Sequence, residues 1–178
     1  SSGSDSNDPE WRQGNECKNN GCLQFDGADY VNLGNNTDFN LPSTGFAFSA
    51  WFKITSRYDS LIHYIISRHD FAANQGYGME VAYTLIPRCD FNGAASPLYG
   101  PVDVIFENEW AHMACVFDGT TYRMYVNGVV VSYAFRGALT NYNGNLYIGT
   151  PSDGAGHADY SFAGLIDDVR LFNAPLTD

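Results

Sequence analysis

The chain contains 178 residues, 44% of them hydrophobic and 15% aromatic, which is the composition of a single globular domain of ordinary size. Its formal net charge of −11, with Lys18 and Lys53 as the only two lysines, excludes the clustered positive charge that binding to nucleic acid or to an anionic membrane surface requires. Eighteen glycines, and twelve residues each of Tyr and Phe, favour many short strands joined by tight turns.

Residues 1–16 form a polar stretch rich in Gly, Ser, Asp and Asn, in which Trp11 is the one apolar anchor. This composition predicts a flexible N-terminal segment, so that one folded domain occupies residues 17–178. The sequence contains no apolar run long enough to cross a membrane and does not open on a signal peptide.

The first half of the domain predicts five strands. CLQF and YVNL, joined by Asp26-Gly27, predict a hairpin, because Asp-Gly readily adopts the positive φ of such turns. Residues 46–54, FAFSAWFKI, alternate, with the apolar side chains on one face and Ser49, Trp51 and Lys53 on the other. HYIISR and GYGMEVAYT predict two further strands around the loop DFAANQ.

The second half continues the pattern. VDVIFE predicts a strand, and WAHMACVF places Trp110, His112 and Val116 on one face of the next. Asp118-Gly119 predicts a turn into YRMYV, and Asn127-Gly128 predicts a hairpin between YRMYV and VVVSYAF. NLYIG and FAGLIDDVRLF complete the set. About a dozen short strands with no helical stretch predict an all-β fold, an antiparallel β-sandwich or jelly roll with one core.

Four cysteines are present, at positions Cys17, Cys22, Cys89 and Cys115, without the CxxC spacing of zinc or redox motifs. Of the three possible pairings we favour Cys17–Cys22, which closes the loop CKNNGC, and Cys89–Cys115, which joins two predicted strands. The alternative is four reduced thiols. Two disulfides predict a secreted or cell-surface protein, because the cytosol keeps thiols reduced.

Four segments, taken in order, resemble one known family: LQFDGADYVNL, FAFSAWFKI, EWAHMACVFDGTTYRMYVNG and FAGLIDDVRLFNAPLT. Together they are similar to the laminin G-like domains of the concanavalin A-like lectin/glucanase superfamily, over about residues 22–178. The resemblance implies a concanavalin A-like jelly roll and a non-catalytic binding module, with carbohydrate as the expected ligand.

The resemblance also implies a structural calcium ion where the first hairpin meets the last strand. The matching positions are Asp26, Asp167 and Asp168, with Asp29 close to the first of them. Calcium takes six to eight oxygen ligands, which carboxylates and turn carbonyls supply. The alternative is that these aspartates cap turns or face solvent.

The loops between the predicted strands carry the side chains that sugar binding uses, namely aromatic rings, short acids and arginines. Seven arginines against two lysines favour planar, bidentate recognition of carboxylate or sulfate groups. The candidate ligand-binding residues are Arg57, Tyr58, His63, Arg68, His69, Asp70, Arg88, Asp90, Tyr99, Arg136, Tyr142, His157 and Tyr160.

The sequence does not favour an enzyme. The ExDxxE string of jelly-roll glycoside hydrolases is absent, and Glu107 and Glu109 fall on a turn. HYIISRH resembles the QIH strand of jelly-roll polysaccharide lyases, but the other strand motifs of that family are missing. The expected partner is therefore an extracellular glycan or polysaccharide, with a protein surface bound by an adhesion or spacer module as the alternative; membrane insertion is not expected.

Overall fold

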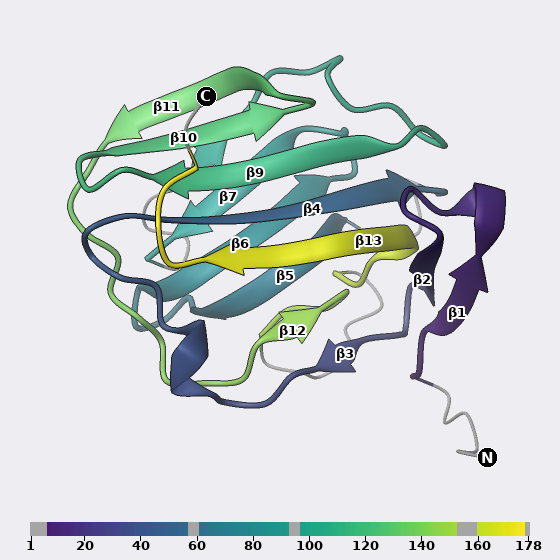
Figure 1. Cartoon of the computed structure of the whole chain (residues 1–178), viewed down its shortest axis with the longest axis horizontal. Coiled ribbons are helices and arrows are strands. Elements are labelled where there is room, and N and C mark those ends of the chain that lie inside the picture. Colours follow the sequence, from purple (N-terminus) through teal and green to yellow (C-terminus); the bar gives the residue numbers. More distant parts are fainter. Residues whose placement is uncertain (1–6, 57–60, 93–96, 153–159, 177–178) are drawn as a thin grey trace.

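The computed structural model describes residues 7–56, 61–92, 97–152 and 160–176 as two packed β-sheets. Sheet A has seven strands in the order β1-β2-β13-β4-β9-β10-β11, and sheet B has six in the order β3-β12-β5-β6-β7-β8. Every pairing within them is antiparallel. In Figure 1, β9, β4 and β13 of sheet A pass in front of β7, β6 and β5 of sheet B. The predicted all-β antiparallel sandwich, of jelly-roll type, is confirmed.

The bounds of the strands of sheet A are β1 Glu10–Gln13, β2 Gly21–Asp26, β4 Phe46–Ile54, β9 Ala111–Phe117, β10 Thr121–Val126, β11 Val129–Phe135 and β13 Ala163–Phe172. Those of sheet B are β3 Val31–Asn32, β5 Ile62–Asp70, β6 Gln75–Ala82, β7 Pro87–Phe91, β8 Leu98–Tyr99 and β12 Tyr147–Ile148. The helices of the described ranges are two single 3-10 turns, η1 Gly14–Glu16 and η2 Thr37–Phe39. In these ranges no helix is long and apolar enough to span a membrane.

The core lies between the two sheets and is rich in aromatic rings. Phe46, Phe48 and Phe52 of β4 all point inward and are completely buried, as the alternation of residues 46–54 predicts. The Phe48 ring centroid lies 5.2 Å from that of Tyr77 in sheet B, so aromatic contacts join the two sheets directly. The outer face of β4 therefore carries Trp51 and Lys53.

Both disulfides of the favoured pairing are present. Cys89 lies on β7 of sheet B and Cys115 on β9 of sheet A, so their bond crosses the core and ties the two sheets together. Cys17–Cys22 closes a short loop just before and into β2. The Asn127-Gly128 hairpin is also confirmed, with φ of +50° and +80° at its two turn residues.

Two predicted strand arrangements are wrong. Asp26-Gly27 does turn the chain, but β2 pairs in sheet A while β3 pairs with β12 in sheet B, so the turn connects the sheets and forms no hairpin. VDVIFE forms no strand, because Asp103 adopts φ of +62° and interrupts the extended backbone. Ile105 alone of this segment is buried in the core, while Val102 and Phe106 are exposed. The local sequence therefore specified the turn at Asp26-Gly27 and the apolar residue Ile105, but not which strands pair with each other.

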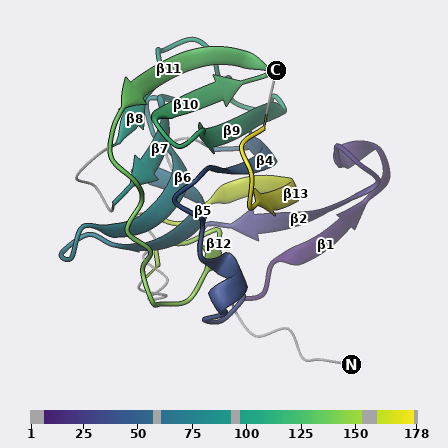
Figure 2. The ribbon, with the colours of Figure 1, turned by 60° about the vertical axis from the view of Figure 1, so that its left-hand side comes forward.

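Part of the segment expected to be flexible is a strand. Residues 10–13 form β1, which pairs with β2 at one edge of sheet A (Figure 1, Figure 2). Trp11 anchors this strand against Gly21, where an added Cβ would lie 2.5 Å from the indole ring. The absence of a side chain at Gly21 therefore makes room for the tryptophan, and the strand extends the domain beyond the predicted start at residue 17.

Candidate ligand site on the outer face of sheet B

The register of sheet B brings four side chains into one row on the face turned away from the core. Tyr64 of β5 is opposite Glu80 of β6, Glu80 is opposite Arg88 of β7, and Arg88 is opposite Tyr99 of β8. The alternate residues of the same strands, such as Met79 and Cys89, face the core. We call Tyr64, Glu80, Arg88 and Tyr99 the polar row; Asp90 lies beside it, two residues along β7 from Arg88.

An arginine between two buried carboxylates forms the centre of the row. Glu80 and Asp90 are both 0% exposed. The Nε atom of Arg88 lies 2.7 Å from Glu80 Oε1 and donates a hydrogen bond to Asp90 Oδ1 at 2.8 Å. The ionic contact with Arg88 is the main compensation for the buried charge of Glu80, and the neighbouring Tyr64 hydroxyl adds a smaller one.

Burial dominates the protonation of this cluster. It raises the pKa of Glu80 well above the usual value, and the neighbouring Asp90 carboxylate adds to the rise. Burial also raises the pKa of Asp90, against the opposing attraction of Arg88. Tyr64 is 3% exposed, and burial raises the pKa of its phenol well above the usual value. The phenol therefore stays protonated at every physiological pH. For Arg88, burial works to lower the pKa, but the two carboxylates outweigh it and the pKa rises.

The raised pKa of Glu80 predicts a pH-dependent stability. Because the folded chain holds this proton more tightly than the unfolded chain does, the free energy of unfolding falls as pH rises from about 4.5 through the folded pKa. Glu80→Gln should remove this contribution, giving a flatter profile and a higher melting temperature at neutral pH. Thermal melts between pH 4 and pH 8 measure it, with the exposed Glu10→Gln as the control variant. A Glu80→Gln profile parallel to that of the wild type would contradict the expectation.

The guanidinium presents its other side away from the carboxylates. Both acids contact Nε, and Nη1 and Nη2 of Arg88 form no hydrogen bond with any residue in the described parts of the chain. The Arg88 Cζ atom lies 5.4 Å from the centroid of the Tyr99 ring, which is 58% exposed. The exposed part of the row is therefore the Tyr99 ring, and beside it lies the fixed Arg88 guanidinium, whose side chain is 15% exposed.

A hollow of about 320 Å³ continues the face beyond Tyr64. The His69 ring lies 5.7 Å from Tyr64 and 3.9 Å from Phe71, and so links the row to the hollow. Gly78 makes room for this imidazole, since an added Cβ would lie 3.2 Å from Nδ1. The hollow is lined by His69, Asp70, Phe71, Ala72, Tyr142, Pro151 and Ser152. Aromatic rings with a few polar groups in a concave surface are typical of a ligand site.

Comparison with known proteins decides the family. The model for the concanavalin A-like lectin/glucanase superfamily matches residues 25–178. The chain belongs to this superfamily. No curated protein matches it by sequence.

Solved structures of the superfamily fold are similar in shape and distant in sequence. Domain 4 of an extracellular arabinanase from Geobacillus stearothermophilus, in complex with arabinotriose, has a TM-score of 0.68 at 18% identity, over 95% of this chain and 77% of that one. The CBM40 domain of a Ruminococcus gnavus sialidase bound to α2,3-sialyllactose has a TM-score of 0.66 at 16% identity, over 88% and 91%. Domains LG4-5 of the mouse laminin α1 chain give 0.64 at 16% identity, over 84% and 40%.

Six of the candidate ligand residues lie on the outer face of sheet B or line the hollow that continues it. Arg88, Asp90 and Tyr99 belong to the row or lie beside it, and His69, Asp70 and Tyr142 line the hollow. Two other candidates, Arg136 and Tyr160, lie elsewhere in the structure. Arg136 donates to the carbonyl oxygen of Pro97 at 3.4 Å, and Tyr160 is exposed ahead of β13. Arg57, Tyr58 and His157 lie outside the described residues.

Two candidates are corrected, because His63 and Arg68 point into the sandwich. His63 is completely buried, with its ring 5.8 Å from that of Phe162. Arg68, also completely buried, donates to the carbonyl oxygens of Gly144 and Phe39. A β-bulge between Tyr64 and Ile66 explains the arrangement, because the register shift there puts Tyr64 and His69 on the same outer face although they are five residues apart.

The four aspartates predicted to bind calcium do not converge. Asp26 is opposite Ala163 in the β2–β13 ladder, whereas Asp167 lies four residues further along β13, about 13 Å away at 3.3 Å per residue. No group of three or more metal-binding side chains occurs in the described ranges. The single four-aspartate site is therefore not formed, and the residues fall into two pairs.

Each pair has local partners. Asp29 is 7% exposed, and its Oδ2 accepts from the backbone N–H of Asp26 at 2.9 Å. Burial raises the pKa of Asp29, and the charges of Asp26 and Asp8 raise it further. At the other end, Asp167 accepts from the N–H of Asn19 at 2.7 Å, and Asp168 pairs with Arg170.

The candidates did not include Tyr64, Glu80 or Phe71. Alternation in residues 76–82 carried a usable signal for Glu80, because Tyr77, Met79 and Val81 face the core and a glutamate among them must face outward. For Tyr64 and Phe71 the sequence carried no such signal, because a β-bulge sets the direction of Tyr64 and a turn sets that of Phe71.

Proposed function

We propose that this chain is a non-catalytic carbohydrate-binding module of a secreted or cell-surface protein, with its glycan held on the outer face of sheet B. The observation that carries the proposal is the Arg88 guanidinium, which Glu80 and Asp90 hold in place with its Cζ atom 5.4 Å from the centroid of the exposed Tyr99 ring. Tyr99 offers a stacking surface for the apolar face of a sugar, and the guanidinium offers paired donors for hydroxyl or carboxylate oxygens.

The geometry of the acids argues for binding without catalysis. Glycoside hydrolysis needs two carboxyl groups that flank the scissile bond and reach it. Glu80 and Asp90 are completely buried, and both contact the same nitrogen of Arg88. They hold the arginine in place and do not face open space. Their role in the proposal is to position the cation.

Two further observations support the proposal. Similar structures include a sialidase CBM40 domain bound to α2,3-sialyllactose and an arabinanase domain in complex with arabinotriose, so this fold holds acidic and neutral sugars in other proteins. The two disulfides fit an oxidising compartment outside the cytosol.

Calcium is part of the proposal in a narrower form. The Asp26–Asp29 turn fits a cation better than the β13 pair, because Asp29 is nearly buried and repelled by Asp26 and Asp8. A bound cation would relieve that repulsion, and turn carbonyls are suitable additional ligands. Asp168 is already neutralised by Arg170.

A glycan array tests the proposal, run with the wild-type chain and with Tyr99→Ala, each with 1 mM calcium and after EDTA. We expect discrete glycan hits for the wild type and about a tenfold or greater loss of affinity for Tyr99→Ala, the scale of one stacking contact. Tyr83→Ala, another half-exposed tyrosine, is the matched control and should bind as the wild type does.

The outcomes separate the alternatives. Neutral-glycan binding that Tyr99→Ala leaves intact would overturn the site on sheet B. An array without hits in either buffer would overturn the glycan function and favour a protein-binding adhesion or spacer module. A calcium-dependent rise in melting temperature that Asp29→Asn abolishes would support the calcium site, and a melting curve indifferent to calcium and EDTA would overturn it.

A further inference from the structure

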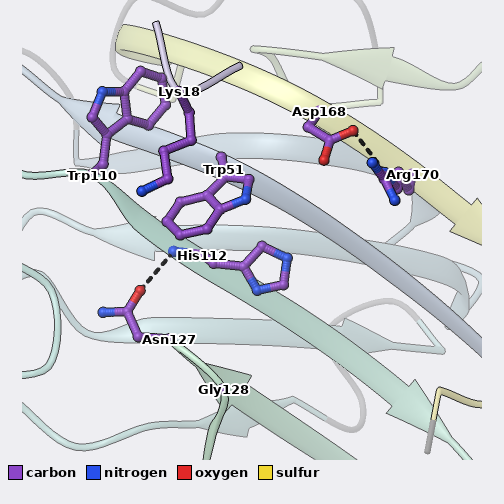
Figure 3. A pocket seen from close by; sticks show the side chains of 8 residues that line it. All are labelled: Lys18, Trp51, Trp110, His112, Asn127, Gly128, Asp168 and Arg170. Atoms are coloured by element: carbon purple, nitrogen blue, oxygen red, sulfur yellow. Dashed lines mark hydrogen bonds and ion pairs between the residues drawn. The ribbon is translucent and has the colours of Figure 1, made fainter.

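The outer face of sheet A carries a groove of about 600 Å³ that the sequence did not predict (Figure 3). Its lining residues are Lys18, Trp51, Trp110, His112, Asn127, Gly128, Asp168 and Arg170. Because Trp51 alternates with the core residues Ala50 and Phe52, it points away from sheet B. The groove and the polar row therefore lie on opposite faces of the sandwich.

Indole and imidazole rings form the floor of the groove. Trp51 of β4 is opposite His112 of β9 in the strand register, and their ring centroids are 5.1 Å apart. Trp110 immediately precedes β9 on the same side. The Asn127 side chain accepts a hydrogen bond from the backbone N–H of His112 at 2.9 Å and closes one end of the groove (Figure 3).

Both lysines of the chain lie at these tryptophans. The Lys18 Nζ atom is 4.0 Å from the centroid of the Trp51 ring, and the Lys53 Nζ atom is 5.7 Å from that of Trp110. Neither lysine forms an ion pair with a carboxylate in the parts of the chain that the structure describes. In a chain of net charge −11, two cations without a carboxylate partner on one aromatic surface form a local site for anions.

The Cys17–Cys22 loop builds one wall and places Lys18 there. The disulfide packs with Leu165 and Trp110 in a small apolar cluster on the outer face. The Asp167 carboxylate accepts from the backbone N–H of Asn19 at 2.7 Å, which fixes the residue next to Lys18. The cation is thus carried by a cross-linked and hydrogen-bonded loop, which lowers the ordering cost of binding.

We propose that this groove is a second saccharide site, specific for an acidic sugar whose carboxylate or sulfate group is bound by Lys18. The apolar face of the sugar ring packs on the indoles of Trp51 and Trp110, and the ammonium group exchanges its weak hold on the Trp51 ring for a charge-assisted hydrogen bond to the anion. The site rests on residues separate from those of the proposed function. With both sites filled, one domain holds glycan on each of its two faces.

Intrinsic fluorescence reads this site directly, because the groove contains two of the three tryptophans. The probes are tetragalacturonate, a sulfated galactan tetrasaccharide and neutral galactotetraose. We expect the acidic probes to change the emission and to bind less tightly at high salt. Lys18→Gln should weaken their binding about tenfold or more, as loss of a hydrogen bond to a charged group does. Trp51→Phe should weaken it too, while Arg12→Gln, which changes a residue outside the groove, should not.

The possible results test separately the second site, its specificity for acids and the saccharide assignment. Acidic-probe binding that survives Lys18→Gln and Trp51→Phe but is lost in Tyr99→Ala would overturn the second site and leave the first in place. Binding lost in Lys18→Gln but kept in Tyr99→Ala would support it. Galactotetraose binding as tightly as tetragalacturonate would overturn the specificity for acids, and equal binding of hexaglutamate would overturn the saccharide assignment. Melting curves of each variant show that the fold is retained.

Discussion

Arg88→Ala should lower the free energy of unfolding at pH 7 by about 3–5 kcal/mol, the cost of leaving a buried charge without its partner. The substitution removes the cation that the described residues place beside the buried carboxylates of Glu80 and Asp90. Their protonation then becomes the only relief, so the loss should shrink as pH falls towards 4. Urea unfolding at pH 4 and pH 7 measures both effects.

Two comparisons show whether charge is the cause. Arg12→Ala removes an arginine whose ion pair with Glu10 is solvent-exposed, and it should cost about 1 kcal/mol or less. The triple variant Glu80→Gln, Asp90→Asn, Arg88→Met removes all the charges together and should recover most of the loss, as buried ion pairs replaced as a unit often do. A triple variant as unstable as Arg88→Ala would indicate lost packing in place of an unpaired charge. Arg88→Ala should also abolish glycan binding at the row.

Removing the inter-sheet disulfide should have the next largest effect. The Cys89→Ala, Cys115→Ala double variant should lower the free energy of unfolding by about 3–4 kcal/mol, because the bond closes a long loop in the unfolded chain. Alanine is chosen since both cysteines are completely buried, and a serine hydroxyl there would lack a partner.

The second disulfide is the internal control. Cys17–Cys22 closes a loop with a sequence separation of 5, against 26 for Cys89–Cys115, so its removal should cost only about 2 kcal/mol. It should nevertheless weaken acidic-probe binding in the groove on sheet A, where its loop carries Lys18. Equal losses of stability from the two double variants, measured by urea unfolding, would contradict the loop-length argument.

Local patterns in the sequence determined most of the elements of this fold. Alternation alone assigned the two faces of β4, since a period of two fixes which side chains meet the core. Asn127-Gly128 specified its hairpin because these residues tolerate positive φ. An even number of cysteines without metal-site spacing pointed to the oxidised state. These features depend on residues close together in the chain, so the sequence by itself was sufficient.

The sites were decided by tertiary structure. The polar row exists because four strands pair in one register, and the bulge in β5 turns Tyr64 and His69 to the same side while Arg68 turns inward. Lys18 reaches Trp51 across 33 positions of the chain only through the disulfide loop. Asp26 pairs with Ala163 at the start of β13, four residues before Asp167, and only the register shows this separation. Pairing between distant segments is set by how the whole core packs, and no local pattern encodes that.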